Sequence, residues 1–298
     1  MINYSEKLDG EPTKKAEGFP ILDSRLITPT ILKKYNIKLV ECGDYIQVYY
    51  YENSKSIYPK KDTTDLELKK QKLNKIFNEN EEQKEINKND LIENKIELRN
   101  IIRSKLTCQR IAKSNTDKWE TFITLTFENN ITEIKTANKK FRYFIDKVRR
   151  IKKDFSYIAI PEFQKRGAIH YHLLTNISID DEKLIYSQED NPKFKHIKYW
   201  NDGFTSIEII KGDMKKVVGY ISKYMTKDID NRLFGFRRFL YSQNLILPKS
   251  SYIDVNDERD FEFYQQKIQG KELIYENEYI NPYDNTIVSF LEFNIDDD

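Results

Sequence analysis

One segment, EFQKRGAIHYH at residues 162–172, constrains the fold of this 298-residue chain most strongly. Apolar, β-branched and aromatic residues on both sides of it predict two strands, Phe155–Gln164 and Ala168–Ile177. The turn between them is Lys165-Arg166-Gly167, and a three-residue hairpin loop commonly ends in a left-handed residue, the place that Gly167 occupies. The segment therefore predicts an antiparallel hairpin.

The register of this hairpin follows from its turn. Gln164 pairs with Ala168, so Glu162 pairs with His170, and their Cβ atoms should lie about 5 Å apart. Residues two apart in a strand share a face, so His172 should project beside His170. The opposite face carries apolar side chains to bury, namely Phe163, Ile169, Tyr171 and Leu173.

Two imidazoles and one carboxylate are the ligands of a borderline metal site that leaves coordination positions open. Such a site suits manganese or magnesium in the cell, and an open position lets the metal polarise a phosphate oxygen. The same histidines could instead only pack or form hydrogen bonds. The hairpin alone leaves both interpretations open.

Around the hairpin the pattern alternates between strands and helices, as in an α/β or α+β core. We expect strands at Thr121–Phe127 and Phe204–Ile210, and an amphipathic helix at Ile131–Lys153. A further helix should run from Asp213, a plausible N-cap, to about Lys227. Residues 181–202 are interpreted as a loop or insertion.

The chain divides into four expected regions. Residues 1–60 hold a probable hairpin in which KLVEC and YIQVYYY flank a Gly43-Asp44 turn, and residues 61–115 form a charged helical region. Residues 116–250 form the core domain. Residues 251–298 are an acidic C-terminal region with thirteen acidic and three basic residues.

The net charge of +2 hides a strongly basic stretch. Lys139–Lys153 holds eight basic residues and one acid, interleaved with Phe141, Tyr143 and Phe144. Cations neutralise phosphates and aromatic faces stack on bases, so this stretch suits nucleic acid, although a Lys-rich helix is more often simply a solvated face.

Cysteine content and hydropathy exclude other classes. Only Cys42 and Cys108 are present, so neither a disulfide framework nor a cysteine-rich zinc site is expected, and both are interpreted as ordinary buried thiols. No apolar run approaches the length that crosses a bilayer, and the first residues lack the apolar stretch of a secretory signal. We expect no membrane partner and a cytoplasmic location.

A second motif, VVGYISKYMTKD, follows the hairpin in sequence. Its helical spacing places Tyr220 and Tyr224 on one face, with Lys223 and Lys227 nearby. Tyrosine is a poor nucleophile at its ordinary pKa of about 10, so a cation or metal must favour the phenolate. Tyrosines at this spacing are also common as packing residues, and the motif alone does not indicate an enzyme.

Taken together, three segments resemble the motifs of HUH endonuclease replication initiators of the single-stranded DNA phage and rolling-circle plasmid type. They are FITLTF at 122–127, EFQKRGAIHYH at 162–172 and YISKYMTK at 220–227, in the same order and at similar separations. The resemblance covers roughly residues 100–250. FGFRRFLYSQNLILP, at 234–248, resembles the basic and aromatic segment that often follows.

The resemblance implies roles for particular residues. His170, His172 and Glu162 would hold a divalent metal, Mn²⁺ or Mg²⁺. Tyr220 or Tyr224, or both in turn, would attack a DNA phosphate and form a 5′-phosphotyrosine; the pattern leaves their order open, and we favour Tyr224 slightly. Lys223 and Lys227 would stabilise the phenolate or the leaving oxygen.

The implied fold is α+β, with a central antiparallel sheet, the histidine strand in its middle, helices packed on one face and a helical N-terminal region before it. The implied substrate is a single-stranded DNA origin. Phosphate contacts are expected from basic residues near the motifs, namely Lys165, Arg166, Arg149, Arg150, Arg237 and Arg238.

No GxxxxGK[ST] motif occurs in the chain, so a host helicase and polymerase are the expected partners. Two alternatives stay open. One is a single-tyrosine HUH transposase, and the other is a DNA-binding protein without catalytic activity.

Overall fold

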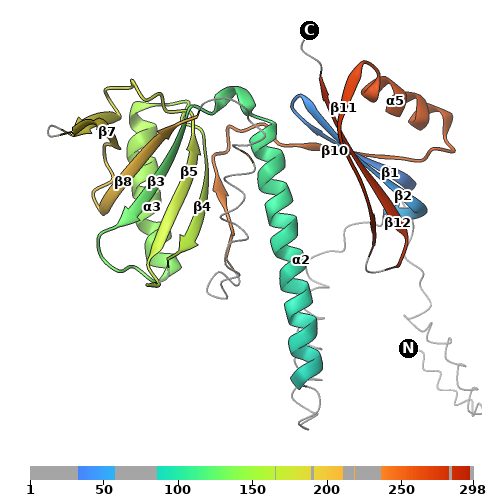
Figure 1. The fold of residues 1–298 in the computed structure, drawn as a ribbon, viewed down its shortest axis with the longest axis horizontal. Coiled ribbons are helices and arrows are strands. Elements are labelled where there is room, and N and C mark those ends of the chain that lie inside the picture. Colours follow the sequence, from blue (N-terminus) through green and yellow to red (C-terminus); the bar gives the residue numbers. More distant parts are fainter. Residues whose placement is uncertain are drawn as a thin grey trace, which may run out of the picture.

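The computed structural model describes residues 33–57, 86–164, 166–188, 191–210, 218, 236–281 and 284–295. Within these ranges the chain is mixed α and β, with two five-stranded sheets and a smaller two-stranded one. Figure 1 shows the two larger sheets on either side of the long helix α2, which spans Ile86–Lys113. No described helix is long and apolar enough to cross a membrane.

The first sheet contains the predicted hairpin. Its order is β8-β3-β5-β4-β9, so the histidine strand β5 is central, as the resemblance implied. All of its pairings are antiparallel. The strands are β3 (Thr121–Phe127), β4 (Tyr157–Phe163), β5 (Ile169–Thr175), β8 (Gly203–Ile209) and β9 (Leu240–Tyr241).

One face of this sheet packs against helix α3, Ile134–Ile151, which falls within the predicted range. The buried side of α3 repeats at helical spacing, with Phe141, Phe144 and Val148 among its buried residues. They meet the apolar side chains that alternate along β5, including Tyr171, in one cluster. Burial of this cluster holds the sheet and the helix together.

The other face of the sheet is also covered by a helix, which corrects the expectation that helices pack on one face only. Cys108 and Ile111, near the C-terminal end of α2, share a cluster with Ile158 of β4 and Leu174 of β5. The 3-10 turn Thr116–Lys118 then leads from α2 into β3. An amphipathic helix pattern does not tell which face of a distant sheet it will cover.

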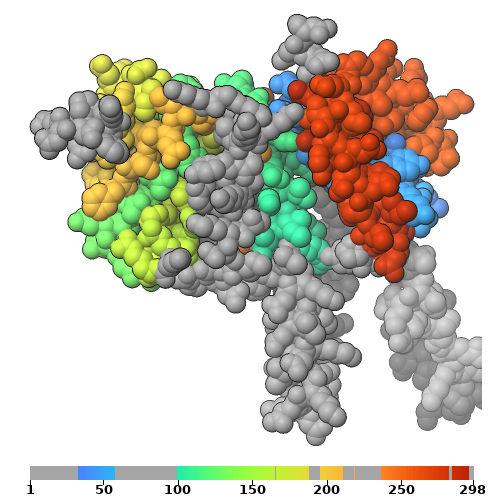
Figure 2. All heavy atoms as spheres, in the orientation of Figure 1, coloured from blue at the N-terminus to red at the C-terminus, as the bar shows by residue number. Residues whose placement is uncertain are grey.

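The second sheet joins the two ends of the chain. Its order is β10-β1-β2-β12-β11, and all of its pairings are antiparallel. Its elements are β1 (Lys33–Cys42), β2 (Tyr45–Ile57), β10 (Lys249–Ile253), β11 (Lys271–Ile280) and β12 (Ile287–Ile295), with helix α5 (Glu258–Ile268) between β10 and β11. In Figure 2 the blue N-terminal and red C-terminal segments lie in the same lobe.

This sheet confirms the first predicted hairpin, because β1 and β2 pair on either side of Gly43, which has a φ of +64°. It also gives ordered structure to much of the acidic C-terminal region. The sequence treated the two ends as separate regions, and pairing of β2 with β12 unites them.

Helix α2 is fastened to the second sheet by polar contacts. Arg110 donates hydrogen bonds to Gln47 Oε1 and Tyr49 Oη, both at 2.7 Å. Lys113 forms an ion pair with Glu292. Of the predicted helical region 61–115, residues 61–85 lie outside the described residues.

Residues 181–202, predicted as a loop or insertion, contain a hairpin instead. β6 (Ile185–Gln188) pairs with β7 (Asn191–Ile197). Ile185 and Ile197 face each other across it and are buried against the core of the first sheet. The strands are short and rich in polar residues, so their alternation was too weak to predict.

Candidate functional site

The β4–β5 hairpin has the predicted register. Gln164 N donates to Ala168 O at 2.8 Å, and Gly167, with a φ of +88°, closes the turn. Glu162 lies opposite His170. The conformation of one glycine thus places the carboxylate beside the histidines.

Both histidines lie on the face of the sheet away from α3. His170 and His172 are 9% and 6% exposed, and in the register they lie opposite Thr126 and Thr124 of β3. Tyr171, between them in sequence, points into the core on the other face. The alternation of β5 therefore separates a polar face from an apolar one, as predicted.

Glu162 contacts the more distant of the two histidines. Its Oε2 atom lies 2.6 Å from Nε2 of His172, although its register partner is His170. Nδ1 of His172 lies 3.2 Å from Oγ1 of Thr124, and its ring stacks on Phe122 at 5.9 Å between centroids. Contacts on two edges and one face fix the orientation of this imidazole.

His170 presents the opposite situation. Its Nε2 atom is buried and has no hydrogen-bond partner among the described residues. Burial, with His172 adding to it, lowers the pKa of His170 to about 4, so the ring is neutral at neutral pH. A buried imidazole nitrogen without a partner is costly unless something else fills that position.

We tested whether these three residues suit a divalent metal. Their chemistry fits, since a neutral imidazole and a carboxylate are ordinary ligands and Nε2 of His170 lacks a partner. However, within the described ranges no group of three or more His, Cys, Asp and Glu side chains is close enough to hold an ion. The ring centroids of His170 and His172 are 6.4 Å apart, and Glu162 bonds His172 directly. The side chains would have to shift, and the metal site stays a prediction.

The predicted tyrosine motif falls outside the described residues, including Tyr220, Tyr224, Lys223 and Lys227. One neighbour in sequence is described. Val218 is 2% exposed and packs in the cluster on the histidine face of the sheet, with Leu174 of the histidine strand among its members. The chain thus returns to this face two residues before Tyr220.

The predicted DNA-contacting residues are not brought together. Arg166 is exposed beside the hairpin turn, where Nε donates to Gln164 Oε1 at 3.0 Å, and its charge adds to the lowering of the His170 pKa. Lys165 lies outside the described residues.

The remaining four arginines lie elsewhere. Arg149 and Arg237 line a cavity of about 400 Å³ on the α3 side of the sheet, the side opposite the histidines. Arg150 is exposed in the last turn of α3. Arg238 is 9% exposed, and burial lowers its pKa.

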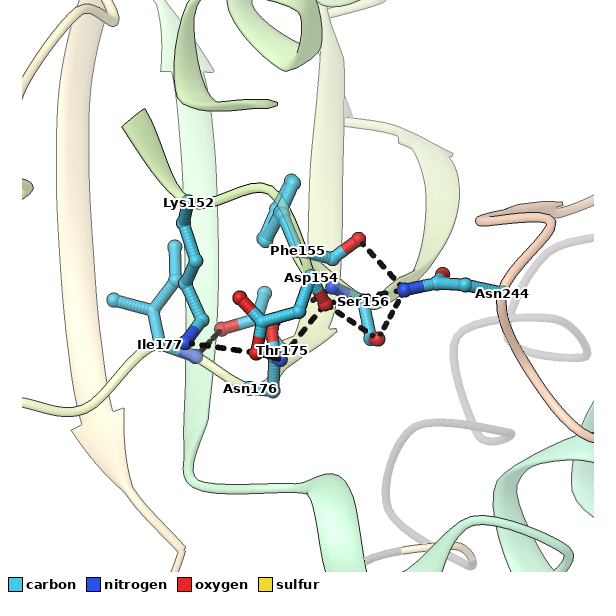
Figure 3. A network of polar contacts seen from close by, with 8 residues as sticks. All are labelled: Lys152, Asp154, Phe155, Ser156, Thr175, Asn176, Ile177 and Asn244. Carbon is cyan, nitrogen blue, oxygen red and sulfur yellow. Dashed lines mark hydrogen bonds and ion pairs between the residues drawn. The ribbon is translucent and has the colours of Figure 1, made fainter. Parts of the chain in front are cut away.

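A polar network that the sequence did not reveal fastens the segment after the tyrosine motif. Nδ2 of Asn244 donates to Ser156 Oγ at 2.9 Å and to Asp154 O at 3.1 Å, and Asn176 Oδ1 accepts from Ser156 N at 2.8 Å (Figure 3). Ser242 Oγ accepts from Tyr157 N at 3.0 Å. The only signal in sequence is the run of small polar residues in YSQN.

Comparison with known proteins places this site in a replication context. Residues 120–229 match the model of a family of replication-associated proteins, the ORF2 family. These residues include both strands of the hairpin and the tyrosine motif. The similarity supports a replication initiator.

A curated relative points the same way. The chain is 28% identical over 154 residues to the phasyl DNA replicon protein arp of Escherichia coli, a match that covers 44% of this chain and 54% of that protein. The chain thus spans about half the length of this relative. No solved structure matches the chain significantly.

Proposed function

We propose that this protein is an initiator endonuclease that nicks and rejoins single-stranded DNA at a replication origin through a phosphotyrosine bond. One observation carries the proposal. Glu162, His170 and His172 gather on one face of the central strand, with a buried His170 nitrogen that has no partner among the described residues. This arrangement lies within the segment similar to replication-associated proteins.

Glu162, His170 and His172 are the residues that would hold Mn²⁺ or Mg²⁺. When bound, the metal would supply Lewis acidity toward a phosphate oxygen. Thr124 and Phe122 position the His172 ring so that Nε2 points toward Glu162. The buried and neutral His170 offers its Nε2 lone pair rather than a charge.

The covalent step belongs to the tyrosine motif. The Oη atom of Tyr224 or Tyr220 forms a bond to phosphorus, and the bond from phosphorus to the 3′ oxygen breaks. The phenol proton is lost and the leaving oxygen gains one, which yields a 5′-phosphotyrosine and a free 3′-hydroxyl. Lys223 or Lys227 stabilises the charge on one of these oxygens. The reverse reaction rejoins the strand without a nucleotide cofactor.

The phosphates beside the scissile bond require cations near the histidine face. Arg166 is the described candidate, because its exposed guanidinium lies close enough to influence His170. The free 3′-hydroxyl would prime a host polymerase, with a host helicase supplying unwinding.

One observation favours a second candidate function. The direct 2.6 Å contact between Glu162 and His172 satisfies both groups without a metal, as in a DNA-binding protein that lacks catalysis. The two candidates differ in whether a covalent product forms.

Incubation of the full chain with Mn²⁺ and a labelled random pool of single-stranded oligonucleotides tests the proposal. We expect a protein–DNA adduct that survives denaturation, is abolished by EDTA and is lost in His170→Ala. The matched control is His196→Ala, whose ring bonds Thr205 O at 2.9 Å away from the site and which should retain the adduct. Stable DNA binding without any adduct would favour the second candidate.

A further inference from the structure

The second sheet has two unlike faces. One face is apolar and packs under α5, with Leu39, Ile46 and Val48 in its core. The other face, by the strand pairings, carries aromatic rings: Tyr49 lies opposite Phe290, and Tyr252 lies opposite Lys38. Further tyrosines extend this row at Tyr35, Tyr51, Tyr275 and Tyr279.

The rings on this face form a connected set. Tyr35 contacts Tyr51 and Tyr252 edge-on, at centroid distances of 5.9 and 4.8 Å. Tyr275 and Tyr279, on the edge strand β11, are 52% and 44% exposed. Exposed aromatic rings on a sheet offer flat surfaces that solvent does not stabilise.

Positive charge is concentrated beside these rings. A groove of about 250 Å³ between the sheet and α2 is lined by Lys38, Arg99, Arg103, Arg110, Tyr49 and Tyr51, together with two apolar residues. None of the lining residues is acidic. Burial, followed by Arg110 and Arg103, lowers the pKa of Lys38, which is the expected response to crowded cations.

Part of this charge is structural and part faces the groove. Arg110 holds the sheet to α2 through Gln47 and Tyr49, and this fixes the Tyr49 ring in place. Arg103 is exposed, as is Ile102 at 49%. Cations next to aromatic faces are what proteins use to bind single-stranded nucleic acid, since the backbone needs charge and the bases need stacking.

We propose that this cation–tyrosine groove is a second binding site, which holds single-stranded DNA on the lobe built from the two ends of the chain. The choice of DNA over other polyanions rests on the proposed function. Charge alone would suit an acidic peptide equally well, but a peptide does not require the row of rings. The groove gives the protein a contact with the strand that does not involve the histidine face.

The test measures binding without cleavage. Fluorescence anisotropy follows a labelled 20-nucleotide oligo-dT on the full chain in EDTA over a series of salt concentrations. Arg103→Ala should make the slope of log K against log salt shallower by about 0.7, the value for one phosphate contact on a single strand. Tyr51→Leu should weaken binding about fivefold or more through lost stacking.

The matched control is Arg259→Ala, an exposed cation on α5, on the opposite face of the same sheet. If Arg103→Ala and Tyr51→Leu both bind with the affinity and salt slope of this control, the proposal is overturned. Melting by circular dichroism checks folding, and if Tyr51→Leu does not fold, the exposed Arg103→Ala decides the result.

The outcome is separable from that of the proposed function. Loss of binding in these variants supports the groove even if wild-type protein never forms an adduct. An adduct from wild-type protein, with oligo-dT binding that matches the control in both variants, overturns the groove and leaves the nicking proposal standing. Equal competition by poly-glutamate, with Tyr51→Leu unaffected, also overturns it.

Discussion

Tyr171 provides a direct test of how β5 separates its two faces. The residue lies between the two histidines in sequence, but its side chain is fully buried on the opposite face. Its ring stacks on Phe141 at 4.5 Å and 14°, and its hydroxyl donates to Asn138 Oδ1 at 2.7 Å. Burial also raises the pKa of this phenol far above its ordinary value. Tyr171 should therefore affect stability and not chemistry.

The size of the effect follows from these contacts. Tyr171→Phe keeps the ring and removes one hydrogen bond, and Asn138 is only half-buried, so water can replace the lost donor. We expect a loss of about 1 kcal/mol in the free energy of unfolding. Tyr171→Ala removes the ring as well and leaves a cavity beside Phe141, so its loss should be about 3–5 kcal/mol.

Urea unfolding followed by circular dichroism measures both losses, since a change in midpoint at constant slope reports stability alone. Adduct formation by Tyr171→Phe, assayed well below its melting temperature, should match the wild type. Two results would refute the reasoning: equal destabilisation by Phe and Ala, or a folded Tyr171→Phe protein that no longer forms the adduct.

Three further predictions concern other parts of the fold. Gly203→Ala should cost roughly 3 kcal/mol or more in a thermal melt, because its φ is +154° and a Cβ would lie 2.2 Å from a backbone oxygen of β3. Gly270→Ala, at φ +72° with no atom within 4 Å, should cost only about 1 kcal/mol, and equal losses would contradict the clash. Lys113→Met, which breaks an ion pair whose side chains are 13% and 12% exposed, should cost about 3 kcal/mol. Lys152→Met, whose partner is 73% exposed, should cost less than about 1 kcal/mol by urea unfolding, and a reversed order would refute the interpretation. Burial raises the pKa of Cys108 to about 12, so at pH 8 its thiolate fraction is about 10⁻⁴ and iodoacetamide should label it only after unfolding; rapid labelling of the native protein would contradict this burial.

The sequence predicted the centre of the first sheet because the decisive signals there are local. Gly167 permits the left-handed turn, and the turn fixes which residues of β4 and β5 face each other. The alternation of polar and apolar residues along β5 then assigns each side chain to a face. The pairing of Glu162 with His170 could therefore be worked out from residues fewer than a dozen positions apart.

The actual contact of Glu162 could not be predicted in the same way. Register sets Cβ positions, whereas side-chain rotamers decide that Oε2 reaches His172 instead of His170. The fixed orientation of His172 depends on Thr124 and Phe122 from another strand. Site geometry at this level depends on packing, which a sequence pattern does not encode.

The second sheet was hidden for a different reason. β2 pairs with β12 across more than 200 residues of chain, and no local pattern links them. β11 is exposed along most of its length, so its charged residues indicated an acidic region and not a strand. The groove beside α2 exists only because these distant segments meet.

The central claim is that the histidine face of β5 serves a tyrosine that becomes covalently joined to DNA. Tryptic mass spectrometry of the adduct tests it most directly, because cleavage after Lys216 and Lys223 places Tyr220 in the peptide VVGYISK and Tyr224 in YMTK. We predict nucleotide-modified YMTK, VVGYISK or both from the wild type and from His196→Ala, and neither from His170→Ala. A modification on any other peptide, or an adduct that persists undiminished in His170→Ala, would contradict the account.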